Sequence, residues 1–135
     1  MTRSERQPEV ILDFIFEDGL FFIAVKNIGT GPAHDVSVVF DKKFIGVEGK
    51  EISALPLFKK IAFLAPQKEI TVFLDHSASY FRRRQPTNIR ATICFKDNSG
   101  TAHTTAVKHD LKIYKDIGYV RRHSEAGRQP SLEKS

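Results

Sequence analysis

The chain has 135 residues, of which 41% are hydrophobic and 27% charged, and its formal net charge is +5 at neutral pH. This size fits one domain, and this composition is typical of a folded globular protein rather than a disordered one. The single cysteine excludes an internal disulfide, and no window approaches the roughly 20 apolar residues of a membrane helix. We therefore expect a cytoplasmic protein without a membrane span in this chain, although the soluble part of an anchored protein would have the same sequence properties.

Apolar residues recur with a period of two, and turn residues interrupt them about every ten positions, which predicts β-strands. Alternation over 9–16 predicts a first strand, and the residues 17–19 predict a tight hairpin turn. The stretch 20–28 is apolar on both faces at first, as expected of a central strand that is covered on both sides. A corner at 27–32 then leads to a third strand over 34–40.

The middle of the chain has a less regular pattern. Glycine and proline break any period in 41–58, so we expect a loop with a short edge strand around 44–47. The segments 59–64 and 69–74 are predicted to form a hairpin around the turn 65–68. The apolar spacing in this region also suits one helical turn, through Leu57, Ile61 and Leu64.

The last third of the chain returns to a clear pattern. The polar stretch 75–87 is expected to be exposed, and 88–95 alternates cleanly, with four inward residues, Ile89, Ala91, Ile93 and Phe95. The residues 97–100 predict a turn, and 101–114 is expected to close the sheet. Seven or eight short antiparallel strands in about 105 residues predict an immunoglobulin-like β-sandwich.

The predicted domain covers residues 9–116. The remaining segment, 117–135, is polar and has no periodic apolar residues, so we expect it to be a disordered tail.

Two motifs resemble a known family. The segment 25–36 reads V-K-N-I-G-T-G-P-A-H-D-V, and I-A-F-L-A-P at 61–66 precedes an amphipathic strand. Both resemble a pattern in many small bacterial proteins that are similar to the bacterial cell-adhesion-related domain, an immunoglobulin-like sandwich. The resemblance covers 20–41 and 61–75, supports the predicted fold and implies no shared active site. This chain has Gln67 where the pattern usually has glycine, so we expect the second turn to differ in geometry.

The corner at 27–32 is predicted to be a structural turn. Gly29 and Gly31 are expected to take positive φ, Asn27 to bond its own backbone, and Pro32 to end the turn in an extended conformation. Glycine-rich loops that hold phosphate precede helices, whereas this corner precedes a strand. We therefore assign it to folding rather than to ligand binding.

No pattern of catalytic or metal-binding residues is present in the sequence. The five histidines have no recognised metal-ligand spacing between them, so we predict no metal and no cofactor; they are His34, His76, His103, His109 and His123. Cys94 alternates with inward residues and is therefore expected to point away from the core. Three carboxylates fall in or beside turns, where Asp bonds the local backbone, namely Asp75, Asp97 and Asp110. The sequence therefore predicts a protein that is not an enzyme.

The most suggestive cluster is the run Tyr80, Phe81, Arg82, Arg83 and Arg84, in the expected loop before the strand at 88. Aromatic residues beside arginines can stack on bases and neutralise phosphates. The same residue types are enriched at protein interfaces. In the structural alternative, the two aromatic residues anchor the loop on the sandwich and the arginines stay solvated.

These observations predict a non-catalytic protein–protein interaction or assembly module. The alternative is a module that binds a polyanion or nucleic acid through the arginine run. Lys42-Lys43 and Lys59-Lys60 would extend a basic surface, but lysines on strand edges also discourage edge-to-edge pairing. The sequence leaves the partner and the oligomeric state open.

Overall fold

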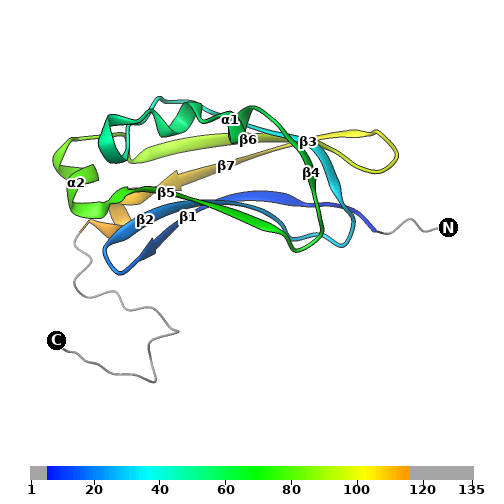
Figure 1. Cartoon of the computed structure of the whole chain (residues 1–135), viewed down its shortest axis with the longest axis horizontal. Helices are drawn as coiled ribbons and strands as arrows, with labels where there is room; N and C mark the ends of the chain where they lie inside the picture. Colours follow the sequence, from blue (N-terminus) through cyan, green and yellow to red (C-terminus); the bar gives the residue numbers. More distant parts are fainter. Residues whose placement is uncertain (1–5, 116–135) are drawn as a thin grey trace, which may run out of the picture.

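The computed structural model describes residues 6–115, which form two antiparallel β-sheets packed face to face (Figure 1). The three-stranded sheet has the order β1-β2-β5, from β1 (Val10–Glu17), β2 (Leu20–Asn27) and β5 (Glu69–His76). The four-stranded sheet has the order β4-β3-β6-β7, from β4 (Ile61–Leu64), β3 (Ala33–Phe40), β6 (Asn88–Lys96) and β7 (Ala102–Asp110). The predicted immunoglobulin-like sandwich is thus confirmed, with seven strands.

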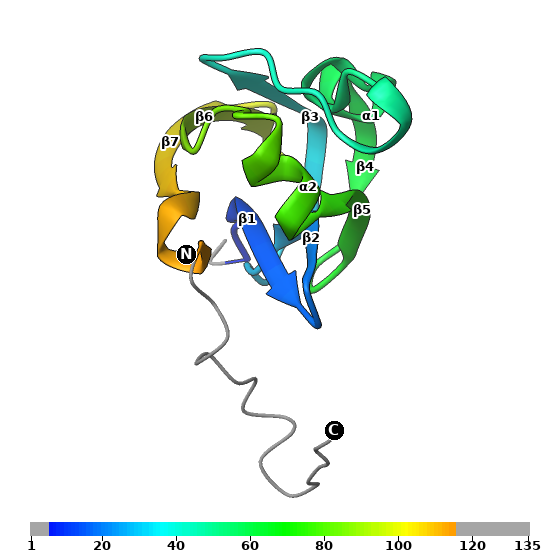
Figure 2. The ribbon, with the colours of Figure 1, turned by 90° about the vertical axis from the view of Figure 1, so that its left-hand side faces the viewer.

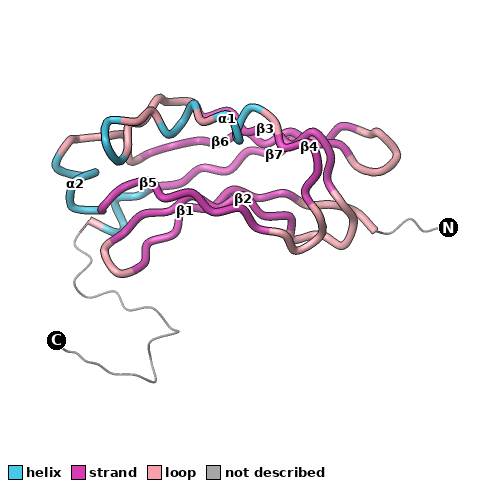
Figure 3. The backbone as a smooth tube through the Cα atoms, viewed as in Figure 1, coloured by secondary structure: helices cyan, strands magenta, loops and turns pink. Residues whose placement is uncertain are grey.

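Short helical segments fill the longer connections and gather around one end and one edge of the sandwich (Figure 3). They are α1 (Pro56–Lys59), α2 (Ser77–Arg82) and the 3-10 turns η1 (Val47–Gly49), η2 (Ile52–Ala54) and η3 (Leu111–Tyr114). Proline stands at the first position of α1, where its missing N–H costs no hydrogen bond. The edge strand expected around 44–47 is reduced to a single bridge between Ile45 and Glu51.

The core lies between the sheets and follows the period-two pattern of the strands. In β6, the four residues predicted to face inward are buried, namely Ile89, Ala91, Ile93 and Phe95. In β1, Val10, Leu12 and Phe14 are buried in the same way. Each fully buried aliphatic or aromatic side chain contributes about 1.5–3 kcal/mol through its removal from water.

The turn between β1 and β2 is a tight hairpin, as predicted. Asp18 and Gly19 both have positive φ, at 54° and 77°, which matches the right-handed twist of the flanking strands. The hairpin registers Glu17 with Leu20, and β2 then pairs with β5 on its other side. The prediction that 20–28 forms a central strand is therefore confirmed.

The predicted hairpin of 59–64 with 69–74 is wrong. β4 pairs with β3 in the four-stranded sheet, whereas β5 pairs with β2 in the three-stranded sheet. The turn at 65–68 is a corner that passes from one sheet to the other, and it lies against the 27–32 corner, which crosses between the same two sheets (Figure 1). Gln67 donates its backbone N–H to the carbonyl of Asn27 at 2.7 Å, and Asn27 donates to the carbonyl of Lys68 at 3.1 Å.

Gln67 has a φ of 67°, in the left-handed region where glycine is the usual residue. The expected difference from the turn geometry of the family pattern stays a prediction. The side-chain Nε2 of Gln67 donates to the carbonyls of Ile28 at 3.2 Å and Gly29 at 2.9 Å. The side chain therefore ties the second corner to the first.

The prediction of positive φ at Gly29 and Gly31 is also wrong, because the positive-φ glycines of the described residues are elsewhere. These two glycines are instead required by a close approach of the chain. A Cβ at Gly29 would lie 2.6 Å from the backbone nitrogen of Glu9, and a Cβ at Gly31 would collide with the carbonyl oxygen of Arg6. The N-terminal segment thus passes directly over the bare backbone of the corner.

Asn27 is the polar centre of the corner and is fully buried. Its Nδ2 donates to the carbonyls of Gly31 at 2.9 Å and Leu64 at 3.1 Å. Its Oδ1 accepts from the backbone N–H groups of Gly29 at 2.9 Å and Glu9 at 3.1 Å. The predicted bonding of Asn27 to its own backbone is confirmed, and the same side chain also joins β4 and the N-terminal segment.

Two sequence-based predictions lie outside the described residues: the tail over 117–135 and the position of His123. Within 6–115, no helix is long and apolar enough to cross a membrane.

Candidate functional site

The segment that carries the aromatic and arginine residues is a short helix rather than the expected exposed loop (Figure 2). Within α2, Tyr80 is fully buried, and its ring lies edge-on against Phe21, with 5.7 Å between the ring centroids. Its hydroxyl donates to the carbonyl of Pro86, and burial raises the pKa of the phenol. Tyr80 is a core residue, and its ring is not available to a base or to a partner protein.

Phe81 is half-buried and packs edge-on against Phe21 at 5.5 Å. The two aromatic residues therefore anchor this segment on the sandwich, as the structural alternative states. Sequence reasoning missed the helix because six residues are too few to establish a helical period.

The three arginines have different surroundings. Arg83 forms an ion pair with the buried carboxylate of Asp75 and donates to the carbonyl of Ile45 at 3.1 Å. Arg82 and Arg84 are exposed, and Arg84 has a φ of 55°. The structure therefore does not bring the arginine run together as one cationic surface.

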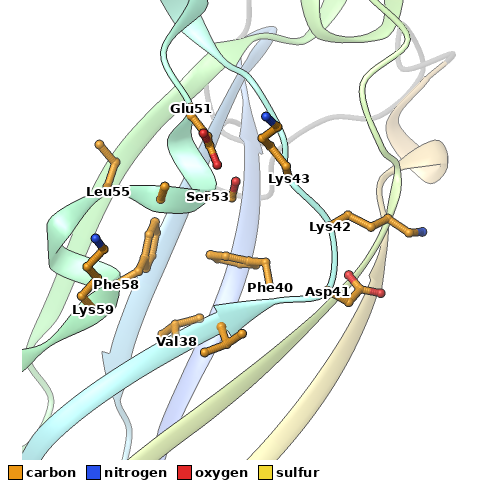
Figure 4. A pocket seen from close by; sticks show the side chains of 12 residues that line it. Val38, Phe40, Asp41, Lys42, Lys43, Glu51, Ser53, Leu55, Phe58 and Lys59 are labelled. Atoms are coloured by element: carbon orange, nitrogen blue, oxygen red, sulfur yellow. The ribbon is translucent and has the colours of Figure 1, made fainter.

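An open groove of about 350 Å³ lies between the end of β3 and the segment that contains η2 and α1 (Figure 4). Its apolar part is formed by Phe40, Leu55 and Phe58. The rings of Phe40 and Phe58 meet edge to face with centroids 5.0 Å apart. Because Phe58 is buried and Phe40 is half-buried, the ring of Phe40 is the partly accessible aromatic surface of the groove.

Charged residues stand around this apolar surface (Figure 4). Lys42 donates to the carbonyl of Asn88 at 2.6 Å, and Asp41 accepts from the backbone N–H of Arg90 at 2.9 Å. Lys43 and Lys59 are exposed and have no hydrogen bond or ion pair with any described residue. The groove thus combines an apolar floor with two cations, Lys43 and Lys59, and two carboxylates, Asp41 and the exposed Glu51.

Two residues after α2 hold the segment that carries one side of this groove. Gln85 accepts the backbone N–H of Ile45 at 2.7 Å, and Arg83 binds the carbonyl of the same residue. Ile45 follows directly after Lys43 and Phe44, and the backbone N–H of Phe44 donates to Ser53 at 3.0 Å. Arg83, which was predicted to bind a ligand, thus contacts the segment that borders the groove.

Within residues 6–115, no three His, Cys, Asp or Glu side chains form a group that could hold a metal ion. His103 bonds the carboxylate of Asp97 at 2.8 Å in the turn after β6, and this contact lowers the pKa of that carboxyl. His109 bonds the carbonyl of Leu12 at 2.9 Å. Cys94 is half-buried, and its sulfur lies 3.6 Å from the hydroxyl of Thr104 on the outer face of the four-stranded sheet.

Sequence reasoning noticed the paired lysines but missed the groove. The signal was present in Phe40, Phe44 and Phe58, three aromatic residues around an irregular stretch. These rings come together because α1 packs against β3. The periodicity of the sequence does not reveal this contact between distant segments.

Residues 1–115 match the family described as "Domain of unknown function (DUF8453)". The chain belongs to the DUF8453 family. The match covers the whole sandwich and ends at the last described residue. No curated protein and no solved structure is detectably similar to this DUF8453 chain.

Proposed function

We propose that this DUF8453 protein is a non-catalytic binding module, and that the groove beside Phe40 receives a segment of a partner protein. The observation that carries the proposal is the half-buried ring of Phe40 in a groove that Lys43 and Lys59 also line, whose charges no described residue engages.

The chemistry of the groove favours one kind of partner segment. An apolar side chain would be removed from water against the floor formed by Phe40, Leu55 and Phe58. A neighbouring Asp or Glu would meet the ammonium groups of Lys43 and Lys59, which steer association and fix orientation more than they add affinity. The ligand class is therefore a peptide with an apolar anchor and a flanking carboxylate.

A peptide-display selection on the immobilised full-length protein tests this function. We expect the selected peptides to combine an aromatic or large aliphatic residue with a flanking Asp or Glu. The variant Lys43→Glu/Lys59→Glu should weaken the binding of these peptides by about tenfold or more, the scale of reversing two interface charges. The matched control Lys68→Glu/Lys112→Glu reverses two exposed lysines outside the groove and should leave binding unchanged.

The same protein should also be titrated with single-stranded DNA and RNA. If it binds nucleic acid with a steep salt dependence, and Arg82→Ala/Arg84→Ala abolishes that binding, the polyanion function is the correct one. Selected peptides without acidic residues, or peptides insensitive to the lysine reversal, would contradict the proposed groove.

A further inference from the structure

β7 is an edge strand of the four-stranded sheet. It pairs in unbroken register with β6 over nine residues, and no described strand lies on its other side (Figure 2). Its sequence, AHTTAVKHD, has no proline and no bulge, and its lysine belongs to the set of side chains on the outer face. Such edges are normally shortened, bulged or covered, because their free N–H and C=O groups pair with other strands.

The other edges of the sandwich are protected in these ways. β4 has four residues and is followed by Pro66. β5 has an irregular register with β2 at Phe21/Phe22. In β1, the carbonyl of Leu12 is already bonded by the His109 side chain at 2.9 Å. β7 is therefore the edge best suited to accept another strand.

The hydrogen bonds at both ends of the β6–β7 ladder fix which β7 groups are free. Asp97 donates to the carbonyl of Thr101 at 3.0 Å, and Leu111 donates to the carbonyl of Thr87 at 2.8 Å. Hydrogen-bonded pairs alternate with non-bonded pairs in an antiparallel ladder. The odd-numbered residues of β7 therefore bond β6, and the even-numbered ones direct N–H and C=O to the open edge. These are Ala102, Thr104, Ala106, Lys108 and Asp110, all of them exposed.

We propose that β7 pairs antiparallel with β7 of a second copy of this chain, centred on Ala106, to give a twofold dimer with one continuous sheet. A second copy of the chain is the proposed partner because β7 is complementary to itself. A register centred on Ala106 uses all nine residues and places the free even-numbered groups of one copy opposite those of the other. Each such pair can exchange two hydrogen bonds.

The charges of the strand agree with this register. Lys108 would lie opposite Thr104 of the second copy, and Asp110 opposite Ala102, so no like charges face each other across the edge. A register centred on Lys108 would instead oppose two lysines.

The outer face of the sheet also continues across the proposed axis. Val39, Thr92 and Ala106 form one row across β3, β6 and β7, and Val39 is 64% exposed. In the dimer, this uncharged row would meet its copy at Ala106. The proposal concerns a different surface from the groove, which is formed by β3 and the segment up to α1, so neither proposal depends on the other.

Sedimentation of the full-length chain over a range of concentrations tests the dimer. We expect twice the monomer mass for the wild type and a monomer for both Ala106→Lys and Ala106→Glu, since each places a charge opposite its own copy. An equimolar mixture of the two variants should recover the dimer, because the charges are then opposite in sign. The control Ala62→Lys makes the same change on β4, at the other edge of the sheet, and should remain dimeric.

Thr104 tests the register. Thr104→Glu should tighten the dimer and Thr104→Lys should weaken it by about tenfold, because both changes face Lys108 of the second copy. A wild type that stays monomeric at all concentrations would overturn the proposal. So would a dimer that Ala106→Lys leaves intact, or a mixture of the Ala106 variants that remains monomeric.

Discussion

The two ends of the sandwich are closed by different chemistry. At one end, the corners at 27–32 and 65–68 lie against each other, joined by backbone hydrogen bonds and by the buried amide of Asn27. At the other end, where α2 lies beside β5 (Figure 2), the ring of Tyr80 packs against Phe21, and the ion pair of Arg83 with Asp75 ties the end of the helix to β5. Substitutions at the corner end should therefore change stability alone. Those at the α2 end should also disturb the groove, since Arg83 holds its border.

The largest effect is expected at the corner end, from Asn27→Ala. This change leaves buried N–H and C=O groups of several segments without partners, and each unsatisfied group costs about 1–3 kcal/mol. Because the four hydrogen bonds of Asn27 are buried or partly buried, we expect the free energy of unfolding to fall by about 4 kcal/mol. Urea unfolding measures this free energy. A loss below about 1 kcal/mol would show that the stability of the corner does not depend on the Asn27 amide.

The next effect concerns the close approach at the same corner. Gly31→Ala should cost about 2 kcal/mol, because its Cβ displaces the backbone of Arg6 and the N-terminal segment. Deletion of residues 1–7 removes that backbone, so the same substitution should then cost almost nothing. The control is Gly19→Ala, where φ is 77° and no neighbour is close, so its cost should be the same in both backgrounds. If Gly31→Ala lowered the free energy of unfolding equally in the full-length and the truncated protein, the cause would be backbone strain at Gly31 instead.

At the α2 end, Arg83→Ala should lower the free energy of unfolding by about 1–2 kcal/mol. It leaves the carboxylate of Asp75 buried without its cation, but the arginine side chain is 35% exposed, so solvent screens part of the loss. Arg82→Ala, next to it on an exposed position, should change stability by less than about 0.5 kcal/mol.

Only the Arg83 variant should also weaken the peptides selected on the groove. If both variants bound the peptides equally well, Arg83 would not position the groove, and substitutions at both ends of the sandwich would change stability alone.

The smallest effect concerns pH and lies in the turn after β6. The hydrogen bond from His103, followed by that from Ser99, lowers the pKa of Asp97 in the folded protein. As pH falls, the unfolded chain therefore takes up the proton first, so this stabilisation is complete above the ordinary value of 3.8 and is lost below it. The melting temperatures of wild type and Asp97→Asn should differ most above about pH 5, and the difference should shrink progressively as the pH falls below about 4. A constant difference would contradict the assignment.

The fold could be predicted because its strands carry local signals. Ile89, Ala91, Ile93 and Phe95 alternate with outward residues, and Asp18-Gly19 specifies its own turn, so neither needs distant contacts to be recognised. The corner was also recognised, but the reason for its glycines was not. Positive φ is a local property, whereas the approach of Arg6 to Gly31 joins segments that are far apart in the chain.

Distant contacts also explain the wrong hairpin and the missed site. Two neighbouring strands with a proline between them resemble a hairpin in sequence. Only their pairing partners, β3 for β4 and β2 for β5, assign them to different sheets. Similarly, Tyr80 beside three arginines has the composition of a binding surface. Its burial against Phe21 and the pairing of Arg83 with Asp75 depend on β2 and β5.

The strand order of the larger sheet also determines when that sheet can form during synthesis. β3 pairs with β4, which follows soon after it, but its other edge waits for β6, whose residues are made roughly 50 positions later. At about 5–20 residues per second, a ribosome needs a few seconds to supply that partner. During this time β3, with its apolar residues Val36 and Val38, does not yet have β6 beside it, so the nascent chain presents an apolar strand with a free edge. Folding should therefore be slow, in the range of milliseconds to seconds even for the completed chain, and most sensitive to aggregation before residue 96 has emerged.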